Sequence, residues 1–129
     1  MKRDDMTKRV IEAVKNPHTR ILGHPTGRLL LRREPYEIDL EAVIDAAGQS
    51  NTAIEINANP KRLDLSWHYH QQAKDKGVKI AICPDAHSIV GIDNVKYGVM
   101  MAQKGKLKAE DILTCFGAKA VADFFNQTK

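Results

Sequence analysis

Short apolar runs alternate along the chain with longer segments whose apolar residues recur at helical spacing. The runs lie at 20–23, 52–57 and 78–83, and their length is typical of strands. The helical spacing appears at 5–16, 39–47 and 66–76. Strands that alternate with helices in this way indicate parallel strands joined by right-handed crossovers. The pattern therefore predicts an α/β fold of parallel β/α units in a single domain, residues 1–129.

Caps and breakers predict where the helices begin and end. Asp39 is a good N-cap for a helix with an apolar face of Leu40, Val43, Ile44 and Ala47. Gly48 is expected to stop that helix, and Gly77 to end the helix that Ser66 begins. Residues 89–104 are predicted to be mostly helical, with Val95, Val99 and Ala102 facing inward. The tail, 108–127, is expected to form two short helices broken near Gly117.

Residues that can bind metal stand where two of the predicted strands end. His24 follows the run at 20–23, and Asp85 and His87 follow the run at 78–83. The carboxyl ends of parallel strands are where ligands gather in such folds. A carboxylate beside imidazoles suits zinc, manganese or iron. All three residues are candidate ligands, with a strand-end turn at His24 and a helix cap at Asp85 as the alternatives.

Four further residues are candidates for roles around this edge. Ile54 and Glu55 point to different faces of the same strand. Glu55 is expected to orient ligands or to pair with Arg28 rather than to bind metal itself. Arg28 and Arg62 are candidate phosphate-binding residues, with plain salt bridges as the alternative. Cys83 is either a zinc ligand beside Asp85 on an extended strand or, the preferred interpretation, a buried inert thiol.

The remaining polar and aromatic residues are predicted to have structural or surface positions. Asn57 is expected to be a hydrogen-bonding residue at the strand end. His68 and His70 are expected to be solvated on a surface helix, and Trp67 to pack on a neighbour. Cys115 is predicted to be a core thiol.

Composition limits the classes of protein that fit. The chain has 129 residues, 43% of them hydrophobic, and no apolar run approaches the length needed to span a bilayer. The start, residues 1–6, lacks the apolar stretch of a secretory signal. Cys83 and Cys115 show no framework spacing, so we expect free thiols in a reducing, cytoplasmic compartment. The net charge of +4 is mild, but a cluster of Arg28, Arg32 and Arg33 permits a DNA or phosphoester partner.

The motifs also form an ordered series along nearly the whole chain. They are His24-Pro25-Thr26-Gly27-Arg28, Glu55-Ile56-Asn57-Ala58-Asn59-Pro60, Arg62-Leu63-Asp64-Leu65, Asp85-Ala86-His87-Ser88 and Tyr97-Gly98. The series resembles the PHP (polymerase and histidinol phosphatase) domain, especially the version fused to bacterial family X DNA polymerases. The resemblance implies a distorted (β/α)7 barrel, metal ions at its C-terminal rim, and phosphoester hydrolysis that includes 3′–5′ exonuclease activity in DNA repair. By motif, His24, Asp85 and His87 would be metal ligands.

One departure from the family shapes the expected function. PHP domains open with a His-x-His motif and further His and Glu ligands, and this sequence has neither before Gly23. We therefore expect the C-terminal part of a PHP domain, an incomplete barrel with a partial zinc or manganese site. Whether it is an enzyme stays open, because the activity of the chain alone is expected to be weak or absent. The alternatives are a non-catalytic half-barrel that acts as a packing or interaction module, and a small phosphomonoesterase like histidinol phosphatase.

A sheet of three strands has open edges, and this predicts an assembly. Unpaired edges invite pairing with another chain, and a symmetric dimer is the simplest solution. We expect a homodimer, or association with the missing N-terminal half of the domain. The alternative is a monomer in which the segment from Lys108 onward covers the exposed edge.

Overall fold

The fold is built on a three-stranded parallel sheet with the order β1-β2-β3, in a computed structural model that describes residues 1–129. The strands are β1 (Ile21–Leu22), β2 (Ala53–Asn57) and β3 (Ile80–Cys83). Ile21 lies opposite Ala53, and Ile54 lies opposite Ile80. The predicted α/β class, the number of strands and their parallel direction are confirmed. The closed PHP barrel is not visible in this sheet.

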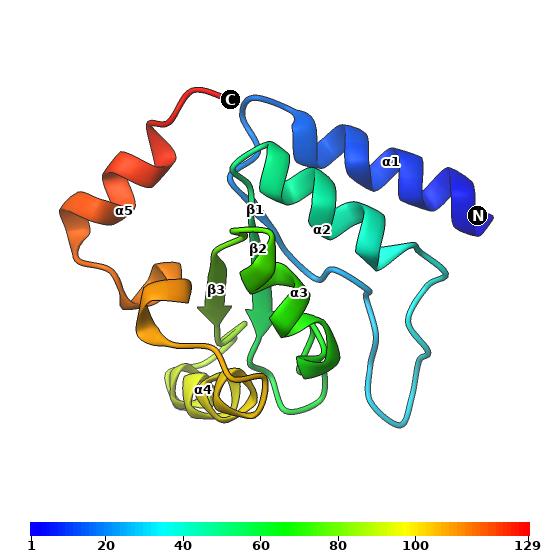
Figure 1. Cartoon of the computed structure of the whole chain (residues 1–129). Helices are drawn as coiled ribbons and strands as arrows, with labels where there is room; N and C mark the ends of the chain where they lie inside the picture. The colour runs from blue at the N-terminus through cyan, green and yellow to red at the C-terminus, as the bar shows by residue number, and fades with distance from the viewer.

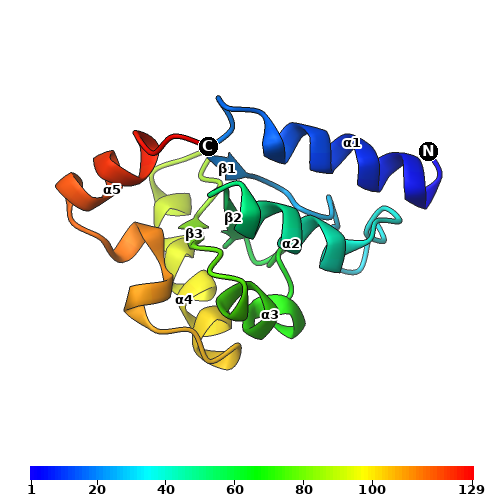
Figure 2. The ribbon, with the colours of Figure 1, turned by 45° about the horizontal axis from the view of Figure 1, so that its top comes forward.

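Five α-helices surround the sheet, joined by short 3₁₀ turns. The helices are α1 (Arg3–Lys15), α2 (Leu40–Gln49), α3 (His70–Asp75), α4 (Val95–Lys104) and α5 (Ala118–Phe125). The 3₁₀ turns are η1 (Trp67–Tyr69), η2 (Val90–Asn94), η3 (Ala109–Asp111) and η4 (Leu113–Cys115). Figures 1 and 2 show α1 alongside α2, and α4 beyond the arrowhead of β3. None of these helices is long and apolar enough to cross a membrane.

The main core lies where the strand isoleucines meet α2. Its members include Ile54, Ile56, Ile80 and Ile82 from the sheet and Leu40, Val43, Ile44 and Ala47 from α2. The predicted apolar face of α2 is therefore confirmed. Asp39 caps this helix as predicted, because its Oδ1 accepts a hydrogen bond from Ala42 N at 3.1 Å. Removal of these side chains from water is the main source of stability.

Gly48 does not stop α2, contrary to the prediction, because the helix continues through it to Gln49. A Cβ at Gly48 would lie 2.6 Å from the carbonyl oxygen of Lys76. This glycine is therefore required by the close approach of α2 to the end of α3. Gly77, with a φ of +72°, follows α3 in the left-handed conformation that the sequence predicted.

The face that α4 turns to the sheet also differs from the prediction. Val95 and Val99 are exposed, contrary to the prediction, whereas Ala102 is buried as predicted and Gly98 is buried as well. A Cβ at Gly98 would lie 2.5 Å from Ile82 Cγ2, so the absence of a side chain lets α4 cross closely over β3. The apolar pattern of the sequence favoured the two valines as the inward residues, and it gave no sign of the contact between Gly98 and Ile82.

The C-terminal segment covers the free edge of β3 and then returns to α1. Ile112 forms a parallel bridge with Ile80, and Thr114 Oγ1 accepts a hydrogen bond from Ile82 N at 3.1 Å. The chain end lies beside the α1–β1 connection (Figure 1), where Lys129 Nζ donates to Val14 O at 2.9 Å. One edge is thus covered within the chain, as the monomer alternative expects, and the dimer stays a prediction.

Two residues have the opposite exposure from the one predicted. His70 is fully buried rather than solvated, and its Nε2 lies 3.2 Å from Leu65 O. The 3₁₀ turn ahead of α3 rotates the helical face, so that His68 remains exposed while His70 turns inward. Cys115 is exposed rather than buried, because the turn η4 directs Leu113 into the core instead.

We expect the stability of the fold to depend on pH through His70. Burial lowers the pKa of His70 from its usual 6.5, so the unfolded chain takes up this proton at a higher pH than the folded chain. The contribution is fully present above about pH 6.5 and declines as the pH falls towards the folded-state pKa. Urea unfolding at about pH 7.5 and about pH 5.5 should show a smaller difference in His70→Gln than in the wild type. An identical difference in both proteins would contradict the assignment.

Candidate functional site

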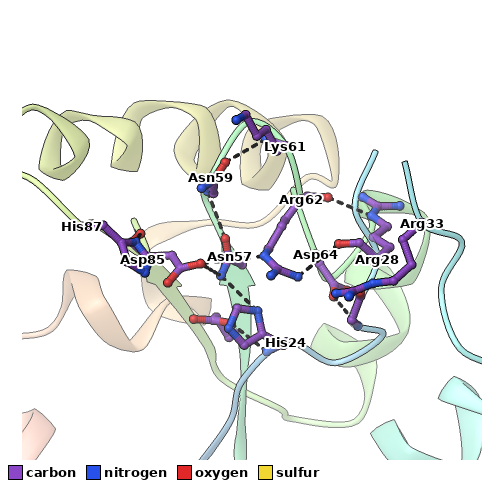
Figure 3. A network of polar contacts seen from close by, with 12 residues as sticks. His24, Arg28, Arg33, Asn57, Asn59, Lys61, Arg62, Asp64, Asp85 and His87 are labelled. Carbon is purple, nitrogen blue, oxygen red and sulfur yellow. Dashed lines mark hydrogen bonds and ion pairs between the residues drawn. The ribbon is translucent and has the colours of Figure 1, made fainter. Parts of the chain in front are cut away.

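Side chains from the ends of β1, β2 and β3 meet at the carboxyl edge of the sheet (Figure 3). Asn57, the last residue of β2, is fully buried, and its Nδ2 lies 3.3 Å from His24 Nδ1 and 3.2 Å from Asp85 Oδ2. Its Oδ1 accepts a hydrogen bond from Asn59 N at 3.1 Å, which leaves the amide nitrogen facing the other two residues. The predicted structural role of Asn57 is confirmed. One amide group thus holds His24 and Asp85 on either side of it.

The backbone at both of these residues adopts an uncommon conformation. His24 has a φ of +46° and Asp85 a φ of +54°. Residues other than glycine rarely adopt positive φ, and such conformations gather at functional sites. The turn at Asp85 also ends the regular alternation of β3, so extended geometry does not place Cys83 and Asp85 on one side.

Glu55 orients the backbone of His24. This carboxylate is almost buried, and its Oε2 accepts a hydrogen bond from His24 N at 2.8 Å. Glu55 has no ion pair with Arg28, so that expected pairing is wrong. The contact fixes where the first turn after β1 begins.

Arg28 and Arg62 tie two loops together beside Asp85. Arg28 Nε donates to Arg62 O at 2.8 Å, and Arg28 Nη2 donates to Leu63 O. Arg62 Nη1 donates to Arg28 O at 3.3 Å, and its Nε lies 3.8 Å from Asp85 Oδ2. Each guanidinium keeps one terminal nitrogen without a protein partner, Nη1 in Arg28 and Nη2 in Arg62.

Asp64 anchors the long loop at 25–38, a role that the sequence did not suggest. It is fully buried, and its Oδ2 accepts hydrogen bonds from Thr26 N at 3.0 Å and Gly27 N at 3.1 Å. Further along the loop, Tyr36 OH donates to His24 O at 2.9 Å. Burial, together with the negative charge of Asp64, raises the pKa of Tyr36, which keeps this hydroxyl protonated as a donor. The only sequence signal for Asp64 was its place in the Arg62-Leu63-Asp64-Leu65 motif.

Cys83 is half-buried beside these acids. Burial, and then the negative charges of Glu55 and Asp85, raise the pKa of Cys83 to about 11. The thiol is therefore protonated at neutral pH and is a poor ligand in this form. This environment agrees with the preferred interpretation of an inert thiol.

His87 lies outside the group formed by His24, Asn57 and Asp85, on the outer side of Asp85 (Figure 3). Its ring is exposed, and its Nδ1 lies 2.8 Å from Asp85 O. No three His, Cys, Asp or Glu side chains gather closely enough to hold a metal ion. His24 and Asp85 are donors that zinc or manganese accepts, but in this arrangement the residues do not complete a metal site.

Known proteins similar to this chain agree with the motif series, although no family profile matches. The DNA polymerase/3′–5′ exonuclease PolX of Bacillus subtilis is 42% identical over 93% of the chain. The resemblance to the bacterial family X DNA polymerases is confirmed. A probable phosphatase of Caldicellulosiruptor saccharolyticus is 39% identical over 64% of the chain, and one of Caldanaerobacter subterraneus is 28% identical over 83%.

The similarity covers only a part of each longer protein. The chain spans 21% of the family X polymerase, and 34% and 42% of these two phosphatases. Similarity both to a family X polymerase and to phosphatases supports a phosphoesterase family of the PHP type. Because the chain matches only a part of each relative, the activity of a whole relative is not established for this chain.

Proposed function

We propose that the chain carries part of a PHP-type phosphoesterase site that acts on the phosphodiester at a 3′ DNA end, within a portion of a distorted (β/α)7 barrel. The observation that carries this proposal is the placement of His24 and Asp85, from the ends of β1 and β3, on the two sides of the Asn57 amide. The names of the relatives, a 3′–5′ exonuclease and phosphatases, support phosphoesters as the substrate class.

Zinc or manganese is the proposed cofactor, with His24 and Asp85 as its ligands in this chain. His87 is proposed as a further ligand, because its Nδ1 is held by a carbonyl and its Nε2 is the nitrogen left available. Only His24 and Asp85 are brought together, on either side of the Asn57 amide, so we expect weak metal binding. Weak or absent turnover by the chain alone follows from the same shortage of ligands.

Phosphate binding is proposed for Arg62 and Arg28. The Arg62 guanidinium lies beside Asp85 and keeps Nη2 free, and Arg28 keeps Nη1 free. A guanidinium with N–H groups to spare can bind a phosphate oxygen while its other bonds hold the loops in place.

A metal titration followed by calorimetry tests the proposal. We expect saturable binding of zinc or manganese that is lost in both Asp85→Ala and Asp85→Asn, the second of which nearly preserves the side-chain shape. Asp93→Ala is the matched control, because Asp93 is a 72% exposed acid whose only side-chain partner is Lys96. The absence of saturable binding in the wild type would favour the non-catalytic packing module.

The phosphatase relatives favour a second candidate function, the hydrolysis of a small phosphomonoester. Turnover of an oligonucleotide and of a phosphomonoester at equal metal concentration separates the two substrates. The cluster of Arg28, Arg32 and Arg33 leads us to expect preference for the polymer. Robust metal-dependent turnover that is lost in His87→Ala would contradict the expected weak activity.

A further inference from the structure

Midway along the loop between β1 and α2, residues 29–33 form a tight, exposed turn, called the tip below. Leu29 and Arg33 form an isolated antiparallel bridge, with Leu29 N donating to Arg33 O at 2.9 Å and Arg33 N to Leu29 O at 2.8 Å. Leu31 at the apex is fully exposed, at 106%, and has a φ of +64°. Figures 1 and 2 show this loop, in light blue to cyan, on the side of the molecule opposite α5.

The tip is held in a fixed position relative to the candidate site. Leu30 N donates to Lys61 O at 2.7 Å, and Arg33 Nε donates to Gly27 O at 2.9 Å. The loop then returns through the hydrogen bond of Tyr36 OH to His24 O. Single exposed leucines are common on protein surfaces. This one differs because an ordered turn holds it outward in a backbone conformation that leucine rarely adopts.

Cations lie within the tip and on the segment that it contacts. Arg32 is exposed, and its side chain has no hydrogen bond or ion pair in the protein. Figure 3 shows Arg28, Arg33 and Arg62 grouped on one side of Asp85, with Lys61 next to Asn59, and Glu34 and Glu37 are the acids on the return of the loop. An excess of cations around an apolar apex matches a polyanion that carries bases able to stack. A nucleic acid has this chemistry.

We propose, resting on the proposed function, that the tip is a wedge that opens the end of a DNA strand. Leu31 inserts against the terminal base and separates it from its neighbour, while Arg32 and the nearby cations hold the phosphates. Leucine is among the apolar side chains that proteins insert between base steps to unstack them. The terminal nucleotide is then free to reach His24 and Asp85. The leucine and the arginine thus have separable roles, in unstacking and in affinity.

The unstacking role is tested with the full chain and a DNA hairpin that carries 2-aminopurine at its 3′ terminus, without added metal. This base analogue brightens when it is unstacked. We expect a rise in its fluorescence on binding, and no rise when the analogue is placed inside the stem. Leu31→Gly should bind within about threefold of the wild type, because its phosphate contacts remain, and should lose the rise at saturation. Glycine accepts positive φ without strain, so the tip keeps its shape.

The affinity role is tested by fluorescence anisotropy across a range of salt concentrations. Arg32→Gln should bind the hairpin more weakly and lower the slope of log K against log salt by about one, with the rise in fluorescence at saturation retained. Lys119→Gln on α5, a 91% exposed cation, is the charge control. Met100→Ala on α4, where the side chain is 55% exposed, is the apolar control. Both controls should behave as the wild type.

Three outcomes would overturn the wedge. They are a full fluorescence rise in Leu31→Gly, no binding of the hairpin at low salt, and Leu31-dependent binding to anionic lipid vesicles in place of DNA. The proposed function fails separately. No saturable metal binding by the wild type, together with an intact Leu31-dependent rise, would reject the phosphoesterase site alone. Metal binding that is lost in Asp85→Asn, together with a full rise in Leu31→Gly, would reject the wedge alone.

Discussion

Asp64→Ala is expected to destabilise the fold by about 2–3 kcal/mol and to loosen the loop at 25–38. The substitution removes a charged acceptor and leaves Thr26 N, which is buried, and Gly27 N without their partner. Hydrogen bonds to charged groups contribute about 1.5–3 kcal/mol each, and a buried donor left unpaired adds a desolvation cost. Asp64 Oδ1 is buried without a partner in the wild type, and removal of that unfavourable group offsets part of the loss. For this reason the expected total lies below the sum of the two bonds.

Urea unfolding measures the loss of stability, and limited trypsin digestion after Arg32 or Arg33 reports the loosening of the loop. Asp64→Asn keeps an acceptor oxygen without the charge, so it should lose less than Asp64→Ala. Asp93→Ala again serves as the control, because an exposed ion pair contributes little to stability. Equal losses in Asp64→Ala and Asp93→Ala, with no change in digestion, would show that Asp64 does not anchor the loop.

Sequence periodicity predicted the sheet because short apolar runs that alternate with helical segments are typical of buried parallel strands. The helix that carries Leu40, Val43 and Ile44 was also predicted correctly, since an apolar stripe at helical spacing has to be buried. Placement of His24 and Asp85 at one edge followed from the rule that parallel strands end on the same side. These features depend on local pattern and on simple geometry.

The missed features depend on tertiary contacts that leave no local pattern. The bonds of Arg28 to the carbonyl groups of Arg62 and Leu63 could not be inferred, because any residue supplies a carbonyl. Gly48 looked like a helix stop, yet its role is set by the approach of Lys76 from another helix. The positive φ at Asp85 and the contact of His87 Nδ1 with Asp85 O also leave no local pattern, and the two residues stay proposed as ligands.

Gly105→Ala is expected to destabilise the fold by about 1–3 kcal/mol, because the added methyl group has no room beside a buried ring. A Cβ at Gly105 would lie 2.1 Å from His70 Nδ1 and 2.6 Å from His70 Cβ. The ring cannot simply move away, since it is fully buried and its Nε2 is paired with Leu65 O. Gly117→Ala is the matched control, because nothing lies within 4 Å of a Cβ at that position.

A double-mutant cycle shows whether the imidazole is the obstacle. In a His70→Ala background the ring is gone, so a methyl group at position 105 should cost little or should fill part of the space that the ring leaves. His70→Ala alone is expected to be destabilising, and the informative quantity is therefore the difference that Gly105→Ala makes in each background, measured by urea unfolding at neutral pH. A large loss in the wild type and a small loss or a gain in His70→Ala would establish the contact. The same loss in both backgrounds would mean that Gly105 is required by its backbone and not by its proximity to the buried histidine.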